Sequence, residues 1–256
     1  MSSITDVYSP RTTFRCTRLR GAKVGSSVCQ FCAVGCSQLG FFKDGKLIDV
    51  EGDPRSAVNE GRLCPKGSST YALNENPYRK VKPMYRAPGS DHWEEVSLDW
   101  MLDTVAKRIW DTRNKGFVEK DPTTGITVNN CANIGFIGGS ANDNEECYLF
   151  RKLFTGGLGI LPVENSARYC HSTTVAALSP TFGFGACTNP PRDLLNSDCI
   201  LIMGSNMAEA HPCAFYWPMQ AKKKGAVTIH VDPRYTRTSA ACDHHVHIRP
   251  ETDIAF

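Results

Sequence analysis

The sequence predicts an α/β protein in which a small cysteine-rich domain with short strands precedes Rossmann-like parallel α/β domains. Four cysteines cluster between residues 29 and 64, and strand-like and helix-like segments alternate after residue 133. Hydrophobic residues make up 41% of the chain and charged residues 21%, which is ordinary for a globular protein. We expect an arm over 1–21, the cysteine-rich domain over 22–82, a first α/β part over 83–165 and a second over 166–256.

The amino-terminal arm is polar and carries several arginines, but no adjacent arginine pair and no apolar core. It therefore has no visible export signal, and the expected compartment is the cytoplasm, or the periplasm if the start is atypical. No stretch approaches the eighteen apolar residues that a membrane span needs, so we expect no direct membrane span. Net charge is +3 without a basic run, so nucleic acid is not an expected partner.

The cysteine-rich domain has a thin apolar core. Phe41-Phe42 and residues 46–50 are typical of short strands, and Asp44-Gly45 predicts the turn that joins them. Because so little apolar surface is available, a metal centre has to help hold this domain together.

The spacing of four cysteines indicates what that centre is. Cys29, Cys32 and Cys36 form a compact group, and Cys64 follows after 27 intervening residues, with a proline after it. A four-iron cluster needs four converging thiolates, and such a group can wrap three corners while the distant cysteine closes the cage. Structural zinc is the alternative, but zinc usually takes two separated pairs of cysteines.

Beyond a proline-containing linker, residues 99–115 predict a helix, because Leu102, Val105, Ala106 and Ile109 share one face. The alternating pattern then predicts strands and helices in turn. The expected strands are 133–137, 199–203 and 227–231, and the expected helices are 144–154 and 211–224. Such alternation is typical of a parallel sheet.

Polar residues follow two of these strands. Gly204, Asn206 and Glu209 come after the first, and Asp232 and Arg234 come after the second. Ligands of open α/β sheets bind at the carboxyl ends of strands, where carboxylates accept hydrogen bonds from a nucleotide. No G-x-G-x-x-G motif is present, so an ordinary nicotinamide site is a poor match. A cap or turn role is as good an interpretation for Glu209 and for Glu251.

Cys170-His171 is a further candidate site, although on its own such a pair is most often a packed thiol beside a surface histidine. A thiolate can ligate a soft metal, and a neighbouring imidazole can accept a proton. Lys66, two residues after Cys64, would by itself be taken for a solvated surface lysine.

The segments around the clustered cysteines, CQFCAVGC at 29–36 and GRLCPKG at 61–67, resemble the cluster domain of the molybdopterin oxidoreductase superfamily. The resemblance extends from about residue 28 to residue 256 and is greatest to the amino-terminal portion of formate dehydrogenase large (alpha) subunits. It implies a [4Fe-4S] cluster on Cys29, Cys32, Cys36 and Cys64. It also implies that Lys66 lies between the cluster and a pterin and helps electrons to cross.

The segment ARYCHS at 167–172 matches the position where formate dehydrogenases have selenocysteine or cysteine followed by histidine. The resemblance implies that Cys170 ligates molybdenum or tungsten in a bis-molybdopterin guanine dinucleotide cofactor and that His171 relays a proton. Similar nitrate reductases usually have methionine after the cysteine, so His171 favours formate. The implied contacts to one guanine dinucleotide arm are Gly204, Asn206, Glu209, Asp232, Arg234, Glu251 and Asp253.

The implied activity is oxidation of formate to carbon dioxide, or the reverse, with electrons leaving through the cluster to an iron–sulfur electron-transfer subunit. Family subunits continue far beyond residue 256, so the chain is expected to be a fragment that works with the remainder of the large subunit. No residue here matches the family's active-site arginine. Two alternatives stay open: a nitrate reductase-like molybdoenzyme, and a non-catalytic subunit that only carries the cluster.

Overall fold

The computed structural model describes residues 2–3 and 18–256, so most of the expected amino-terminal arm, including Cys16, lies outside the described residues. The chain divides into two compact units. The first joins Met1–Arg79 to Thr188–Phe256, and the second is Lys80–Cys187. We describe each unit by itself.

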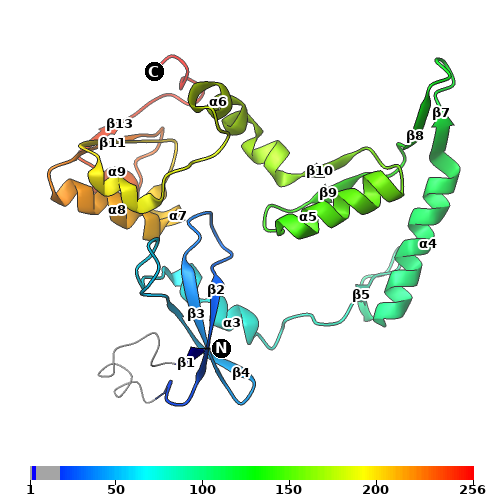
Figure 1. Cartoon of the computed structure of the whole chain (residues 1–256), viewed down its shortest axis with the longest axis horizontal. Helices are drawn as coiled ribbons and strands as arrows, with labels where there is room; N and C mark the ends of the chain where they lie inside the picture. Colours follow the sequence, from blue (N-terminus) through cyan, green and yellow to red (C-terminus); the bar gives the residue numbers. More distant parts are fainter. Residues whose placement is uncertain (1, 4–17) are drawn as a thin grey trace. The chain divides into compact units, whose positions relative to one another are not determined.

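The cysteine-rich part of the first unit is built on an antiparallel sheet in the order β1-β2-β3-β4 (Figure 1). Its elements are β1 (Ser2–Ser3), β2 (Lys23–Val28), β3 (Ser37–Lys43), β4 (Lys46–Gly52) and the short helices α2 (Pro65–Ser68) and α3 (Thr70–Asn74). Asp44 and Gly45 both have positive φ, 51° and 77°, as expected for a two-residue hairpin turn. The predicted hairpin is confirmed, although β3 begins earlier than the two phenylalanines suggested.

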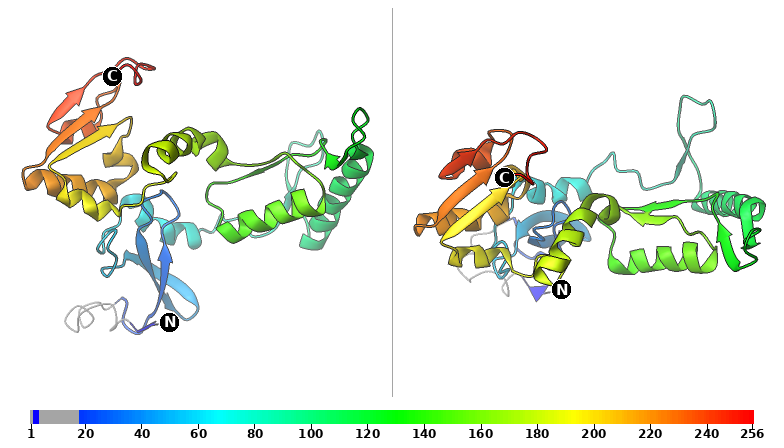
Figure 2. Two further views of the ribbon diagram at one scale, coloured as in Figure 1. Left: turned by 45° about the horizontal axis from the view of Figure 1, so that its top comes forward. Right: turned by 90° about the horizontal axis from the view of Figure 1, so that it is seen from above.

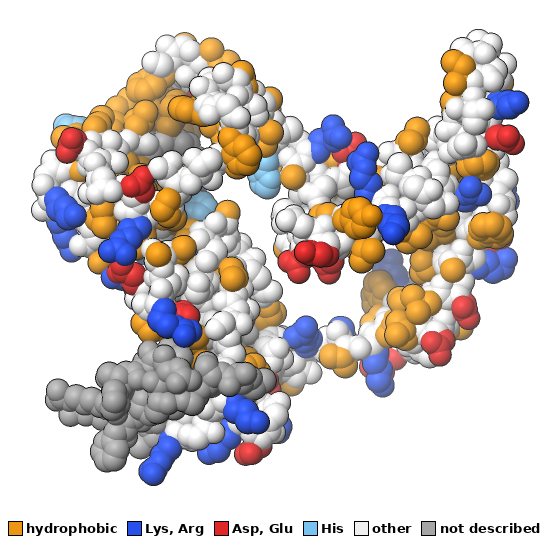
Figure 3. Space-filling view, viewed as in Figure 1, with side chains coloured by type: hydrophobic (Ala, Val, Ile, Leu, Met, Phe, Trp, Pro, Cys, Tyr) orange, Lys and Arg blue, Asp and Glu red, His pale blue; other side chains and the backbone are white. Residues whose placement is uncertain are grey.

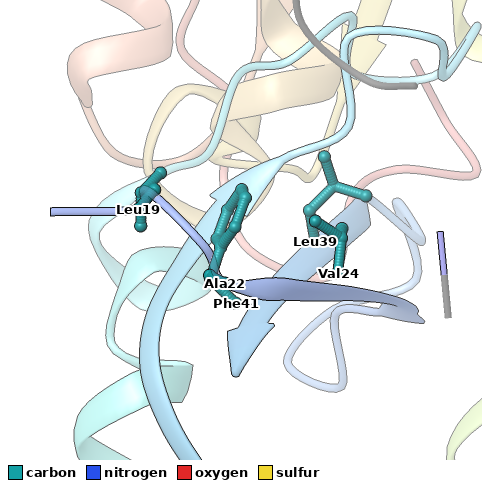
Figure 4. Close-up of a cluster of buried hydrophobic side chains, with 5 residues drawn as sticks. All are labelled: Leu19, Ala22, Val24, Leu39 and Phe41. Atoms are coloured by element: carbon teal, nitrogen blue, oxygen red, sulfur yellow. The ribbon is translucent and has the colours of Figure 1, made fainter. Parts of the chain in front are cut away.

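A small cluster of buried side chains forms the core of this sheet (Figure 4). It contains Leu19, Ala22, Val24, Leu39 and Phe41. Leu39 and Phe41 are two residues apart on β3 and therefore point to the same face of the sheet. The cluster is small, in agreement with the thin core expected from the sequence.

The carboxyl-terminal part of the first unit contains a parallel sheet in the order β11-β12-β13 (Figure 2). Its strands are β11 (Cys199–Met203), β12 (Val227–Val231) and β13 (His244–Val246). Its helices are η4 (Pro191–Asn196), α7 (Met207–Ala210), α8 (Pro212–Lys223) and α9 (Arg237–Ala241). The bounds of β11 and β12 are those predicted, and Pro218 lies inside α8 without ending it.

Packing explains why α8 continues past that proline. Phe215 and Ala221 of α8 are buried against Ile200 and Ile202 of β11. Burial of large apolar side chains contributes about 1.5–3 kcal/mol each, enough to offset a hydrogen bond lost at Pro218. The helix therefore holds its register against the sheet.

Asp243 ties α8 to the parallel sheet. Its carboxylate lies 2.9 Å from Lys222 Nζ and accepts hydrogen bonds from the backbone N–H and the hydroxyl of Thr228, at 2.9 and 2.8 Å. The bond from Lys222, followed by those from Thr228, lowers the pKa of Asp243 to about 2. These bonds favour the ionised carboxylate.

We therefore expect Asp243→Asn to lower the free energy of unfolding at neutral pH. A pKa that is lower in the folded protein stabilises it above the unfolded value, and this stabilisation is lost as pH falls through the folded value. The difference between the two proteins should shrink between about pH 4 and pH 2. Urea unfolding at several pH values measures it, and a difference that is constant across this range would contradict the role given to the charge.

The second unit contains α4 (Leu98–Gly116), which confirms the helix predicted over 99–115. Ser97 caps it by accepting a hydrogen bond from the Trp100 N–H. The other helical segments are α5 (Asn144–Arg151), η2 (Lys152–Gly157), η3 (Ala167–His171) and α6 (Ser172–Phe182). The strands are β5 (Met84–Tyr85), β6 (Glu94–Glu95), β7 (Phe117–Lys120), β8 (Thr127–Cys131), β9 (Phe136–Gly138) and β10 (Val163–Asn165).

Two predicted elements of this unit differ in extent. The strand expected over 133–137 is β9, which begins later and pairs in parallel with β10. The helix expected over 144–154 is α-helical only to Arg151 and continues as the π-helix η2. Parallel pairing of β9 with β10, and of β12 with β11 and β13, confirms the α/β class.

The second unit leaves much apolar surface open. Among its described residues only Cys131 and Ile160 are buried hydrophobic side chains. Leu102, Val105 and Trp110 are exposed on α4, which carries apolar side chains in the space-filling view (Figure 3). An apolar face of this extent is typical of a surface that another part of a protein covers. In the described residues no helix is both long and apolar enough to cross a membrane.

Candidate cluster site, metal loop and nucleotide-binding edge

Three of the four clustered cysteines lie on the loop that joins β2 to β3. Val28 at the end of β2 pairs with Ser37 at the start of β3. The Cys29 N–H donates to the Cys36 carbonyl at 2.8 Å, which closes the loop. Gly35 has φ +65°, a left-handed conformation that glycine adopts without strain. This geometry brings Cys29 and Cys36 together and leaves Cys32 at the far side of the turn.

Cys64 is brought to the same place by the buried side chain of Asn59. The Asn59 amide accepts a hydrogen bond from the Ser37 N–H at 3.0 Å and donates to the Ser37 and Arg62 carbonyls at 3.1 and 2.8 Å. One side chain thus joins the residue after Cys36 to the residues before Cys64. The sequence did not predict the role of Asn59, because asparagine is common in turns and loops for purely local reasons.

All four cysteines line one small cavity, together with the apolar side chains of Phe31, Val34 and Leu63. The remaining lining residues are Lys66, Gly67, Pro212 and Cys213. Cys213 was not predicted as part of this site, because it is distant in sequence and does not belong to the spacing. Within the described residues, no three His, Cys, Asp or Glu side chains are placed to hold a single metal ion.

Burial, followed by the effect of Cys213, raises the pKa of Cys36 to about 12. Burial also raises the pKa of Cys213. Thiolates crowded in an apolar cavity are unfavourable unless positive charge balances them, so metal has to displace the protons. Four thiols around an apolar cavity therefore fit a four-iron cluster, in which each thiolate meets its own iron.

Lys66 connects this site to the parallel α/β part of the first unit. Its side chain is exposed, and Nζ donates to the Glu209 carbonyl at 2.9 Å. Lys66 also lines the cysteine cavity. The lysine is therefore in contact with a residue of the predicted nucleotide-binding edge, as well as with the cluster site.

The carboxyl ends of β11 and β12 bring several predicted residues together. Gly204 has φ +64° and donates its N–H to the Val231 carbonyl at 2.9 Å. Asn206 donates to the Glu209 carboxylate and accepts from the Thr238 hydroxyl at 3.0 Å. Glu209 also pairs with Arg237, at 3.3 Å. These contacts fix the loop after β11, and the exposed Glu209 carboxylate stays at its rim.

The end of β12 is held by histidines. Asp232 is 6% exposed and accepts from the Arg234 N–H at 2.7 Å, which leaves the Arg234 side chain exposed. The buried His230 donates from Nε2 to the Ser205 carbonyl at 3.1 Å, while Nδ1 meets the Ser239 hydroxyl at 2.7 Å. His245 Nε2 donates to the Asp232 carbonyl at 3.2 Å. The two histidines thus support the loops at this edge of the sheet.

Glu251 and Asp253 are both exposed in the turns past β13, at the carboxyl-terminal side of the sheet. Glu251 has φ +68°, which is uncommon for a residue with a side chain. Their role as nucleotide contacts stays a prediction.

Cys170 and His171 close the π-helix η3, which runs into α6. Both side chains are exposed. His171 lines a cavity of about 750 Å³ within the second unit, whose wall includes Asn165, Arg168 and Ser172, whereas Cys170 is outside that lining. Arg168 pairs with Glu164 one turn earlier. A π-helical turn is rare and is frequently found at functional sites.

The fold and the cysteine cavity define an iron–sulfur protein with a parallel α/β body. The Molybdopterin oxidoreductase family model matches residues 79–256, and the Molybdopterin oxidoreductase Fe4S4 domain model matches residues 22–76. The chain belongs to the molybdopterin oxidoreductase family. Together the two matches support a [4Fe-4S] cluster and a molybdenum or tungsten pterin cofactor.

Individual relatives narrow the comparison. The chain is 52% identical over 237 residues to the formate dehydrogenase subunit alpha of Megalodesulfovibrio gigas, covering 92% of this chain and 23% of the relative. It is 33% identical to a periplasmic nitrate reductase of Desulfovibrio desulfuricans, covering 93% of this chain and 30% of that protein. The chain therefore spans only about a quarter to a third of the length of these relatives.

A solved structure agrees with the fold. The acetylene hydratase from Pelobacter acetylenicus superposes with a TM-score of 0.64 at 21% identity, over 90% of this chain and 30% of that one. At this identity the likeness extends to the fold alone. It supports the α/β architecture predicted from the sequence.

Proposed function

We propose that this chain is the amino-terminal portion of the catalytic subunit of a molybdenum- or tungsten-dependent formate dehydrogenase. The observation that carries the proposal is the 52% identity to a formate dehydrogenase alpha subunit over 92% of the chain, against 33% for a nitrate reductase. The Cys170-His171 pair adds to it, because histidine in that position favours formate.

The reaction converts formate to carbon dioxide and releases one proton and two electrons. When bound, the bis-pterin metal centre accepts the electron pair. Cys170 provides the thiolate that holds the metal, since a soft sulfur ligand suits a metal already bound by sulfur. His171 accepts the proton, because an imidazole nitrogen is a base and this side chain lines an open cavity.

The electrons leave through the cluster held by Cys29, Cys32, Cys36 and Cys64. Lys66 is the proposed bridge, and its hydrogen bond to the Glu209 carbonyl supports this role by placing it between the cysteine cavity and the nucleotide-binding edge. Gly204, Asn206, Glu209, Asp232, Arg234, Glu251 and Asp253 are the proposed contacts to one guanine dinucleotide arm. The second arm belongs to the remainder of the large subunit.

The proposed partners follow from this electron path. A cluster that receives two electrons one at a time needs an acceptor, and an iron–sulfur electron-transfer subunit provides one. The exposed apolar face of the second unit supports a further contact with the remainder of the large subunit. The chain covers only 23% of the formate dehydrogenase alpha subunit that it matches, so most of a subunit of that length would be available for this contact.

The test is anaerobic purification of the complete subunit that contains this chain, followed by elemental analysis and a dye-linked assay. We expect four irons for this cluster, about one molybdenum or tungsten, and dye reduction by formate. Oxidation of reduced dye by nitrate instead of formate would identify a nitrate reductase. Iron without molybdenum or tungsten, and without either activity, would identify a subunit that only carries the cluster.

A further inference from the structure

A fifth cysteine, Cys213, lies at the cluster site. It is the second residue of α8, is only 7% exposed, and packs with Cys29 and Cys36 in one buried group. It also lines the same cavity as the four cysteines of the predicted cluster. A single buried cysteine is usually a plain hydrophobic side chain, but this one lies among four others.

The sulfur of Cys213 contacts both segments that carry the cluster cysteines. It packs with the Cys36 side chain in the buried cysteine group, and both line the cavity. On the other side, it accepts a hydrogen bond from the backbone N–H of Cys64, and its thiol donates to the Arg62 carbonyl at 3.8 Å. Cys213 therefore joins the loop between β2 and β3 to the segment that ends at Cys64.

The first turns of α8 are firmly attached to the cysteine-rich domain. Trp217 donates from Nε1 to the Val58 carbonyl at 3.0 Å. The Arg62 guanidinium lies 3.6 Å from the centre of the Tyr216 ring, a favourable cation–π contact. Because these contacts lie one turn after Cys213, they fix the position of its side chain at the cavity.

Four thiolates complete a [4Fe-4S] cluster, and the match to the Fe4S4 domain ends at residue 76, far before Cys213. Cys213 is thus one sulfur more than the cluster takes. A cysteine that binds no metal is a thiol with one S–H donor. A Cys36 that binds iron has lost its proton and can only accept, so the proton of the pair belongs to Cys213.

We propose that Cys213 is a positioning residue that donates its S–H to the Cys36 sulfur and thereby raises the reduction potential of the cluster. Ligand sulfurs gain negative charge when the cluster is reduced, and a donor aimed at one of them stabilises the reduced state. A charged acceptor forms the stronger bond, so the thiol turns from the Arg62 carbonyl to the Cys36 sulfur. The inference rests on the cluster and is independent of the substrate.

The test compares Cys213→Ala and Cys213→Ser with the unchanged protein and with Cys242→Ala. Cys242 is the matched control, because it is a half-buried cysteine of the first unit that lies beside Thr228 and does not line the cysteine cavity. Iron content, the electron paramagnetic resonance spectrum of the reduced cluster and its midpoint potential are measured anaerobically. None of these readouts needs formate turnover.

We expect every variant to keep four irons. Cys213→Ala should have a more negative midpoint potential. The equilibrium constant for one-electron reduction of the cluster should fall by up to about tenfold, which corresponds to about 59 mV. Cys213→Ser keeps a donor and should fall between Cys213→Ala and the unchanged protein, and Cys242→Ala should match the unchanged protein. Loss of iron from both Cys213 variants would make this residue a ligand and overturn the proposal. A midpoint potential of Cys213→Ala equal to that of the unchanged protein would also overturn the proposal. If Cys213→Ala does not fold, Cys213→Ser decides, and an unshifted potential in that variant would overturn the proposal.

Discussion

Replacing Cys170 with alanine in the complete subunit should lower formate oxidation to below about a thousandth of its initial rate, the scale of loss when a principal catalytic group is removed. A methyl group cannot ligate molybdenum or tungsten, so the metal would lose the protein sulfur that holds it. The measurement is the rate of dye reduction by formate, with the metal content of each preparation determined beside it.

The cluster should survive this substitution. Cys170 lies in the second unit, at the end of η3, whereas the four cysteines of the cluster lie in the first unit. The electron paramagnetic resonance spectrum of the reduced cluster should therefore match that of the unchanged protein. Cys199→Ala is the control, because Cys199 is exposed at the start of β11, away from the carboxyl edge of that sheet. Full activity in Cys170→Ala would show that another residue holds the metal.

Much of the fold could be predicted because local patterns decide it. The segments 199–203 and 227–231 form β11 and β12 with unchanged bounds, because their aliphatic and β-branched residues favour strands and Ile200 and Ile202 of β11 pack into the core. The hairpin at Asp44-Gly45 follows from two residues that tolerate positive φ. Helix α4 follows from a cap and an apolar face.

The π-helices η2 and η3 could not be predicted in this way. An extra residue in a helical turn leaves no mark in the hydrophobic periodicity, and η2 even includes Gly156 and Gly157, which are poor helix formers. The α-helix expected over 144–154 therefore ends at Arg151, three residues earlier than predicted. That Cys170 and His171 lie on such a turn became visible only in the structure.

The residues of the candidate site that are close together in sequence could be predicted. Those that come together only through the fold could not. Three cysteines within eight residues and one followed by proline carry a recognisable spacing. Cys213 and Arg62 are 151 residues apart, and the contact between them depends on how α8 packs on the cysteine-rich domain. Long-range packing of this kind depends on many side chains together, so no sequence motif predicts it.

Cys64→Ala should remove the cluster. Cys64 is the only one of the four cysteines outside the loop between β2 and β3, and it lies directly before the first residue of α2. Three thiolates on one short loop cannot surround a cube of four irons, so the fourth corner would be left without a protein ligand. We expect iron to fall well below four per chain, together with loss of the visible absorption and the reduced-state spectrum.

The same substitution should lower the thermal stability of the cysteine-rich domain, because its apolar core is small and metal binding contributes to folding. Cys213→Ala is the informative comparison: it lines the same cavity but should keep four irons. If Cys64→Ala kept its iron while Cys213→Ala lost it, Cys213 would be the fourth ligand. If the unchanged protein held zinc in place of iron, the four cysteines would form a structural zinc site, and the electron path proposed through them would be excluded.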